Sequence, residues 1–146
     1  MIHPKAIELI KLYEGFDSHP YKCPADVWTY GYGATRNIEG ERVTSSTEPI
    51  SKLEAEELLI KMVGRFASRV DGMVDVEINE LQRGALTSFA YNLGSGALKS
   101  STLLRHINAG EWDDIPYQFS RWVFAGGQRL PGLVSRRRSE AMMWLA

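Results

Sequence analysis

Three side chains near the start of the sequence, Glu14, Cys23 and Thr29, carry groups that can take part in acid–base chemistry. Eight residues separate the glutamate from the cysteine, and five separate the cysteine from the threonine. A carboxyl or a thiol can give up or take up a proton, and a hydroxyl can hold a water molecule. Many unrelated proteins contain such a trio by chance, so the residue types alone do not separate an active site from three unrelated side chains.

The expected position of Glu14 at a helix end makes this residue stand out. The apolar spacing predicts a helix over residues 4–14, with Pro4 at its first position and Gly15 ending it. A carboxylate in the last turn lies beside unpaired carbonyl groups and the negative end of the helix dipole, which disfavours its charge. A glutamate that serves only the fold is poorly placed there.

A β-hairpin is expected directly after this helix. Residues 21–23 and 27–32 are rich in β-formers, and the Pro-Ala-Asp sequence of residues 24–26 predicts a turn between them. Gly31 and Gly33 alternate with tyrosines, which indicates a bent strand or a close approach of the backbone to a ligand. The thiol and the hydroxyl of the trio then lie on either side of the turn.

From Ser51 the pattern is helical to the end. Ser51 with Glu54, and Asn79 with Gln82, form capping boxes that open a long helix to about residue 70 and a strongly apolar one after it. Shorter helices are expected over residues 103–108, 113–122 and 133–145. These elements predict a mostly helical α+β protein of one domain: an N-terminal helix and β lobe (1–50), a connecting helix (51–72) and a helical lobe (73–146). A ligand cleft is expected between the two lobes.

The composition is that of an ordinary globular protein. The 146 residues are 44% hydrophobic and 24% charged, with a net charge of −1, which argues against disorder and against a general polyanion binder. Residues 121–146, however, hold five arginines and only Glu140 as an acid, a local excess of +4. This excess either steers the protein towards an acidic polymer or reflects a solvated helix face, and we favour the solvated face.

Metal and redox chemistry find little support in the sequence. The three histidines, His3, His19 and His106, lack metal-ligand spacing, so no metal and no cofactor are expected. The single cysteine excludes an internal disulfide. No apolar run approaches the ~18 residues of a membrane helix, and the first residues lack the pattern of a signal peptide, so we expect a soluble protein without a membrane anchor.

A resemblance to a known family supports an active-site role for Glu14, Cys23 and Thr29. The stretch EGFDSHPYKCPADVWTYGYGAT resembles the N-terminal signature of the phage lysozymes, glycoside hydrolase family 24. In that signature a Glu-Gly ends the first helix, an Asp or Cys follows, and a Thr-x-Gly-x-Gly lies on the hairpin. Glu14, Cys23 and Thr29 match in type and in spacing. The similarity continues in LQRGALTSFAYNLGSGALKSSTLLRHINAG and SRWVFAGGQRLPGLVSRRRSE, and is greatest to the soluble portion of lambdoid-type endolysins.

The resemblance implies a lysozyme-like two-lobed fold and an endolysin-type muramidase. Such an enzyme hydrolyses the β-1,4 bond between N-acetylmuramic acid and N-acetylglucosamine in bacterial peptidoglycan, for host cell lysis. Two other functions stay open: a lytic transglycosylase, which uses a similar glutamate but forms an anhydro sugar, and a non-catalytic wall-binding module. The module would need aromatic sugar platforms but no placed acid, so the matched trio speaks against it.

The resemblance also assigns roles. Glu14 would protonate the leaving oxygen, as cleavage of a glycosidic bond requires. Cys23 stands where many relatives carry Asp, and its thiolate would orient or activate water or stabilise the positive charge on the sugar; the alternative is an inert, buried thiol. Thr29 would hold the water, and without the other two matches it would be a plain β-former.

Further positions follow from the same resemblance. Tyr91, Asn92 and Gly33 are expected substrate contacts, the first two because the Phe-Ala-Tyr-Asn segment lines the far wall of the cleft in relatives. Asp26 stands where relatives commonly have Gly, and could share the role of the cysteine, although a plain turn residue is favoured. Ala34 replaces a structural His, which affects local packing and not activity.

The expected partner is peptidoglycan, with no nucleic acid. The protein is expected to act as a monomer, and to stay in the host cytoplasm until a holin-type pore releases it to the periplasm.

Overall fold

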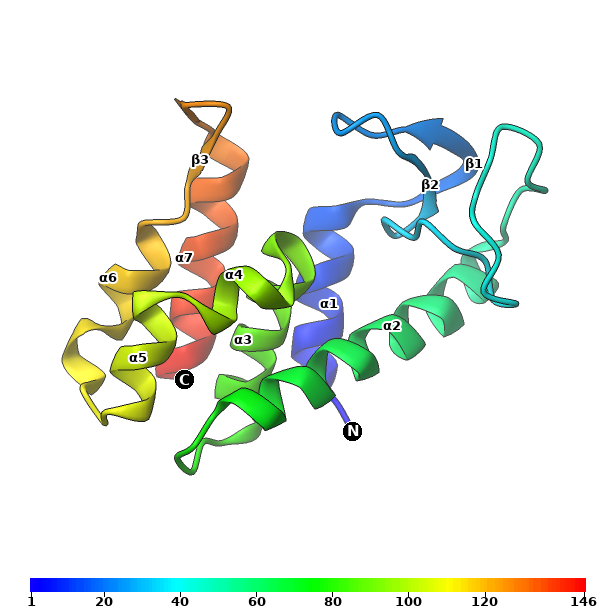
Figure 1. Cartoon of the computed structure of the whole chain (residues 1–146). Coiled ribbons are helices and arrows are strands. Elements are labelled where there is room, and N and C mark those ends of the chain that lie inside the picture. Colours follow the sequence, from blue (N-terminus) through cyan, green and yellow to red (C-terminus); the bar gives the residue numbers. More distant parts are fainter. The chain divides into compact units, whose positions relative to one another are not determined.

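The chain begins with a helix, forms a short β-hairpin, and is helical for most of its remaining length (Figure 1). The computed structural model describes residues 1–146. The elements in order are α1 (Pro4–Glu14), β1 (Asp17–Lys22), β2 (Trp28–Gly31), α2 (Lys52–Met73), α3 (Glu80–Leu93), α4 (Ser95–Lys99), α5 (Thr102–Asn108), a 3₁₀ turn (Trp112–Asp114), α6 (Ile115–Ser120), β3 (Phe124–Ala125), β4 (Gln128–Arg129) and α7 (Pro131–Leu145). The expected mostly helical α+β architecture with a small N-terminal hairpin is confirmed. No helix combines the length and the apolar character needed to cross a membrane.

Internal contacts divide the chain into two compact units. The first, which we call the helical unit, combines Met1–Leu9 with Val63–Ala146. The second, the hairpin unit, is the continuous segment Ile10–Met62. The divisions fall inside α1 and inside α2, so each of these helices supplies residues to both units.

In the hairpin unit, β1 and β2 pair antiparallel, with Tyr21 opposite Thr29. The register is irregular between Asp17 and Tyr21. The first strand begins earlier than the sequence predicts, at Asp17 and not at residue 21, although Asp, Ser, His and Pro are weak strand formers. Pairing across the hairpin outweighs these local preferences, and the irregularity accommodates Pro20, which has no N–H to donate.

Gly31 ends β2 at the point where the hairpin meets α2. Its φ is +62°, in the left-handed region that favours glycine, and a Cβ built on it would lie 3.4 Å from the Cβ of Ala55. The predicted close approach at this glycine is therefore to a neighbouring helix. Around this contact lies the apolar core of the unit, which consists of Ile10, Tyr30, Tyr32, Ala34, Val43, Ile50, Ala55, Leu58 and Leu59.

Both predicted capping boxes are present. The Ser51 hydroxyl accepts from the Glu54 N–H at 3.1 Å, and the Glu54 carboxylate accepts from the Ser51 N–H at 3.3 Å. Asn79 and Gln82 exchange the same two bonds at 2.8 and 2.9 Å. Each box satisfies backbone donors that a helix start otherwise leaves free.

In the helical unit, α3 is the central helix. Seven consecutive residues, 84–90, are buried, so this helix is covered on all sides, as a core helix must be. The apolar cluster around it includes Val70, Leu86, Phe89, Leu98, Leu103, Ile107, Ile115, Phe119 and Trp144. The small β3–β4 hairpin was not predicted from the sequence; its turn is formed by Gly126 and Gly127, with φ of +57° and +78°.

Gly84 marks the closest approach of α3 to the first residues of the chain. A Cβ built on it would lie 2.8 Å from the Cβ of Ala6 and 3.4 Å from the sulfur of Met143. The absence of a side chain at this position therefore lets α1 and α3 pack backbone against side chain.

We predict that Gly84→Ala destabilises the protein by up to about 2 kcal/mol, because an overpacking cost of about 1–3 kcal/mol exceeds the roughly 1 kcal/mol that alanine gains over glycine in a helix. Gly64→Ala is the matched control, since Gly64 lies within α2 and a Cβ there would meet nothing within 4 Å. Chemical denaturation should show a lower free energy of unfolding for the first variant and an equal or higher one for the second. Equal stability of the two variants would contradict the packing described at Gly84.

Candidate active site

The turn between β1 and β2 fixes the position of Cys23. The Cys23 N–H donates to the Val27 carbonyl at 2.9 Å, and the Asp26 N–H donates to the Cys23 carbonyl at 2.8 Å. Asp26 has a φ of +63° and is the one non-glycine residue of the chain with a positive φ. Aspartate tolerates this conformation better than most residues, and the turn closes around the cysteine as a result.

The Cys23 thiol is partly exposed and is surrounded by hydrogen-bond donors. A backbone hydrogen bond from Val27 is the largest effect and lowers the pKa of the Cys23 thiol. Burial acts in the opposite direction, and smaller contributions from the Ala25 backbone and the Thr29 hydroxyl lower the pKa again. Donors that point at the sulfur favour the thiolate over the thiol. This geometry differs from that of an inert, buried cysteine.

Thr29 lies on β2, is buried, and donates its hydroxyl proton to the Val27 carbonyl at 2.9 Å. A hydroxyl has one proton, so it cannot donate to this carbonyl and to the sulfur of Cys23 at the same time. The bond to the Val27 carbonyl and the bond from the hydroxyl to the sulfur that lowers the pKa of the thiol are therefore alternatives.

Glu14 is the last residue of α1, as the sequence predicts, and it is half-buried. Gly15, which follows, has a φ of +70°, and its N–H donates to the Lys11 carbonyl at 3.0 Å. Burial raises the pKa of the Tyr21 hydroxyl, and the charges of Asp17, Glu14 and Cys23 raise it further. The carboxyl and the thiol thus lie within electrostatic reach of the same side chain.

The side chain of Asp26 is turned to another partner. Its carboxylate lies 3.2 Å from the Nζ of Lys22 and is 80% exposed. The Lys22 ammonium also lies over the Trp28 ring, 5.7 Å from its centre. These contacts and the positive φ account for Asp26 as a turn residue.

The remaining predicted contacts are divided between the units. Gly33 belongs to the hairpin unit with Glu14, Cys23 and Thr29, and has a φ of +86° beside the Tyr30–Ala34 bridge. Tyr91 and Asn92 belong to the helical unit, in the last turn of α3. The Tyr91 ring packs on Phe66 with the ring centres 5.4 Å apart.

Sequence reasoning missed a buried charge network around Asn92. Its amide oxygen accepts a hydrogen bond from Arg137, whose Nε lies 3.0 Å from Glu140. Glu140 also accepts from the Ser88 hydroxyl at 2.6 Å and pairs with Arg136 at 3.4 Å. Burial raises the pKa of Glu140, while Arg137, Ser88 and Arg136 act in the opposite direction.

The sequence favoured a solvated helix face for the arginines of residues 121–146, and this prediction is wrong for two of them. Arg136 and Arg137 are 3% and 1% exposed, whereas Arg138 is exposed. The sequence did contain a signal for these ion pairs. Glu140 lies four residues after Arg136 and three after Arg137, and side chains at these spacings are neighbours on a helix. No three His, Cys, Asp or Glu side chains come close enough to hold a metal ion.

The fold and the trio define a class of protein, and comparison with known proteins agrees with it. Residues 11–140 match the phage lysozyme family, and the chain belongs to that family.

Individual relatives extend the match over the whole chain. It is 40% identical to the endolysin of Bacillus phage B103 over 99% of its own length, and spans 54% of that longer protein. It is 32% identical to the endolysin of Acyrthosiphon pisum secondary endosymbiont phage 1, over 98% of this chain and 97% of the relative. Among solved structures, the endolysin from Escherichia coli O157:H7 phage FAHEc1 superposes with a TM-score of 0.88 at 30% identity, covering 99% of this chain and 93% of that one. The expected lysozyme-like fold is confirmed.

The lowered pKa of the Cys23 thiol generates a prediction. Alkylation requires the thiolate, so its rate should reach half its maximum below the pH usual for a cysteine. Thr29→Val removes one donor to the sulfur and should move this midpoint to higher pH, while the backbone donors keep it below the usual value. Iodoacetamide rates measured from pH 6 to 10, with thermal unfolding to check the fold, test this. An unmoved midpoint in a folded variant would show that the hydroxyl does not contact the sulfur.

Proposed function

We propose that the protein is an endolysin-type muramidase that hydrolyses the β-1,4 bond between N-acetylmuramic acid and N-acetylglucosamine in bacterial peptidoglycan. One observation carries the proposal: in a chain of the phage lysozyme family, a helix-end carboxyl and a thiol of lowered pKa both lie within electrostatic reach of Tyr21. A glycosidase needs an acid for the leaving oxygen and a second group for the attacking water. Glu14 and Cys23 have the chemistry for these two tasks.

The proposed reaction begins with proton transfer from the Glu14 carboxyl to the glycosidic oxygen. The bond to the sugar carbon then breaks, and positive charge develops on the ring. The Cys23 thiolate takes a proton from the attacking water, and its own negative charge stabilises the ring as water approaches. Thr29 orients that water with its hydroxyl, which lies beside the sulfur. Gly33, Tyr91 and Asn92 are proposed substrate contacts, and Arg137 holds the Asn92 amide so that its NH₂ group faces away from the network.

Two other functions are less well supported. A non-catalytic wall-binding module would not require donors that lower the pKa of a thiol. A lytic transglycosylase makes an anhydro sugar without water, and so would not require the proposed water-binding residues Cys23 and Thr29 in addition to the acid Glu14. Analysis of the products separates the cases, because hydrolysis leaves a new reducing end and transglycosylation does not.

Access to the wall follows from the same function. We propose that the protein acts as a monomer, remains in the host cytoplasm while the inner membrane is intact, and reaches peptidoglycan in the periplasm through a holin-type pore. Expression in cells with and without a membrane-permeabilising agent tests this, with prompt clearing of untreated cultures as the contrary result.

We predict that Glu14→Gln lowers wall hydrolysis by about 10²–10⁴-fold, the usual contribution of a general acid. An amide of the same shape cannot supply the proton, so the fold should be unchanged. Turbidity clearing of permeabilised Gram-negative cells by purified protein gives the rate. Glu77→Gln, an exposed glutamate in the helical unit, is the control. If the Glu14 variant kept a tenth of the activity, the assignment of the acid would be wrong.

We predict that Cys23→Asp stays within about tenfold of the parent rate, because a carboxylate is ionised at neutral pH, and that Cys23→Ser loses about 100-fold or more, because a hydroxyl is not. Activity that depends on the thiolate rises with pH through the thiol pKa, and the lowered pKa moves this rise to more acidic pH. In the Asp variant the rise should move further, towards the carboxyl range. A fully active Ser variant would assign Cys23 to packing.

A further inference from the structure

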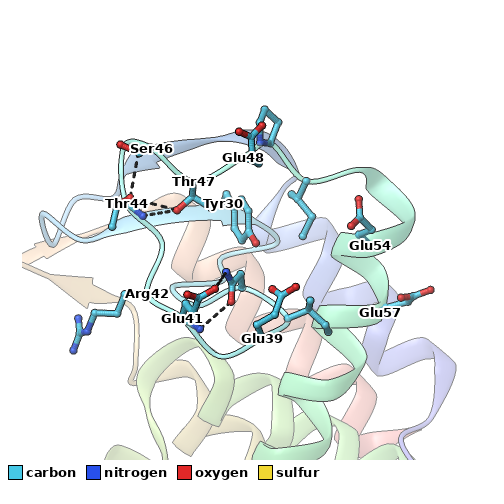
Figure 2. Close-up of a pocket in the computed structure, with 14 residues that line it drawn as sticks. Tyr30, Glu39, Glu41, Arg42, Thr44, Ser46, Thr47, Glu48, Glu54 and Glu57 are labelled. Atoms are coloured by element: carbon cyan, nitrogen blue, oxygen red, sulfur yellow. Dashed lines mark hydrogen bonds between the residues drawn. The ribbon is translucent and has the colours of Figure 1, made fainter.

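A hollow with a volume of about 600 Å³ lies in the hairpin unit (Figure 2). Its wall is formed by the end of β2, the long loop that follows, and the first turns of α2. The charged residues of this wall are five glutamates and a single arginine, namely Glu39, Glu41, Glu48, Glu54, Glu57 and Arg42. None of the proposed catalytic residues lines it.

The floor of the hollow holds an unpartnered hydroxyl. Tyr30 is 4% exposed, and its ring points into the hollow with Glu39 and Glu54 nearby (Figure 2). Its backbone N–H donates to the Ala34 carbonyl at 3.0 Å. Its hydroxyl forms no hydrogen bond to another group of the protein. Burial raises the pKa of the Tyr30 hydroxyl, and the charges of Glu39 and Glu54 raise it further. The ring is buried, while the hydroxyl oxygen is accessible from the hollow and is free to bond to a ligand there.

The negative charge around this hydroxyl is largely uncompensated. Glu41 is held by Asn37 through two hydrogen bonds of 2.8 and 3.2 Å, which leave its charge in place. One carboxylate oxygen of Glu54 caps α2, and the other remains available. Glu39 forms no ion pair, and Figure 2 shows the guanidinium of Arg42 directed away from the hollow. The site therefore favours a cation.

The arrangement suits an organic cation better than a metal ion. No three carboxylates of the chain come close enough to share a metal. A primary ammonium group, in contrast, has three N–H donors that can reach separate acceptors. One can go to the Tyr30 hydroxyl and the others to the carboxylates of Glu39 and Glu54. The volume also leaves room for the carbon chain that carries the group.

We propose that this hollow binds a primary ammonium group on a flexible chain, held by Tyr30, Glu39 and Glu54. Two sources offer that chemistry: a free polyamine, or an amino group on the peptides of the bacterial wall. The second source rests on the proposed function.

The first test is binding of cadaverine, followed by backbone amide shifts in NMR, with 1,5-pentanediol and sodium chloride of equal ionic strength as controls. We expect saturable shifts at Tyr30 and at residues 37–54 with the diamine alone. The double variant Glu39→Gln/Glu54→Gln should raise the Kd by about fivefold or more, the effect of losing two partly exposed charge pairs. Glutamine retains the oxygen that caps α2. The matched variant Glu77→Gln/Asp113→Asn, with the same change of charge at exposed residues elsewhere, should leave the Kd unchanged.

Tyr30→Phe should weaken binding without changing the charge. Shifts no larger than those with sodium chloride, or a Kd equal in the two double variants, would overturn the proposal. Because the titration requires no turnover, it stays independent of any failure of the muramidase assignment.

A second experiment assigns the source, using walls with free or acetylated amino groups. An increase of KM on acetylation that is absent from the Glu39→Gln/Glu54→Gln variant identifies wall peptides as the ligand. Equal KM values with intact cadaverine binding identify a free polyamine.

Discussion

The hydrogen bond from the Cys23 N–H to the Val27 carbonyl is the constraint on which the arrangement of the candidate site depends. It closes the turn so tightly that one residue, Asp26, takes a positive φ. The same closure brings the Val27 and Ala25 backbone to the sulfur and sets Thr29 beside it. A wider turn would leave the thiol with solvent as its main partner and a pKa nearer the usual value. The chemistry proposed for this cysteine is thus a property of the backbone around it.

The helical unit is organised by a different requirement, that a buried charge has partners. Glu140 is fully buried, and its two arginines and Ser88 offset part of the cost of removing a carboxylate from water. Such a network is sensitive to the loss of any member, because the remaining charges stay buried. It also fixes the end of α3 through Asn92, so that a proposed substrate contact is held by residues of α7.

Much of this architecture could be predicted from the sequence, because several helix ends are marked by local signals. The helix starts at residues 51 and 79 were predictable because capping boxes are local signals of backbone hydrogen bonding. The end of α1 at Glu14 was predictable because a glycine follows it. The start of β1 at Asp17 was not, since it depends on pairing with Gly31, fourteen residues later.

In the candidate site, too, the residues could be predicted from local sequence, whereas their surroundings depend on the folded chain. The trio of Glu14, Cys23 and Thr29 could be selected from spacing and from the family signature, but the donors around the sulfur could not, because they come from the turn backbone. Burial of Arg136 and Arg137 was mispredicted because charge alone suggests solvent, while their partners Ser88 and Asn92 lie more than forty positions away. The unpartnered Tyr30 hydroxyl likewise becomes visible only once the loop is folded around it.

The contribution of Met1–Leu9 to the helical unit has a consequence for synthesis on the ribosome. The helix they pack against, through Ala6 and Gly84, is synthesised more than seventy residues after them. The hairpin unit is one continuous segment and has all its own residues long before then. The hairpin unit can therefore fold during translation before the helical unit is complete. Until α3 has been synthesised, the first turns of α1 lack the helix they pack against and remain exposed. Chaperones that bind short apolar helices as they leave the exit tunnel would encounter this protein at that stage.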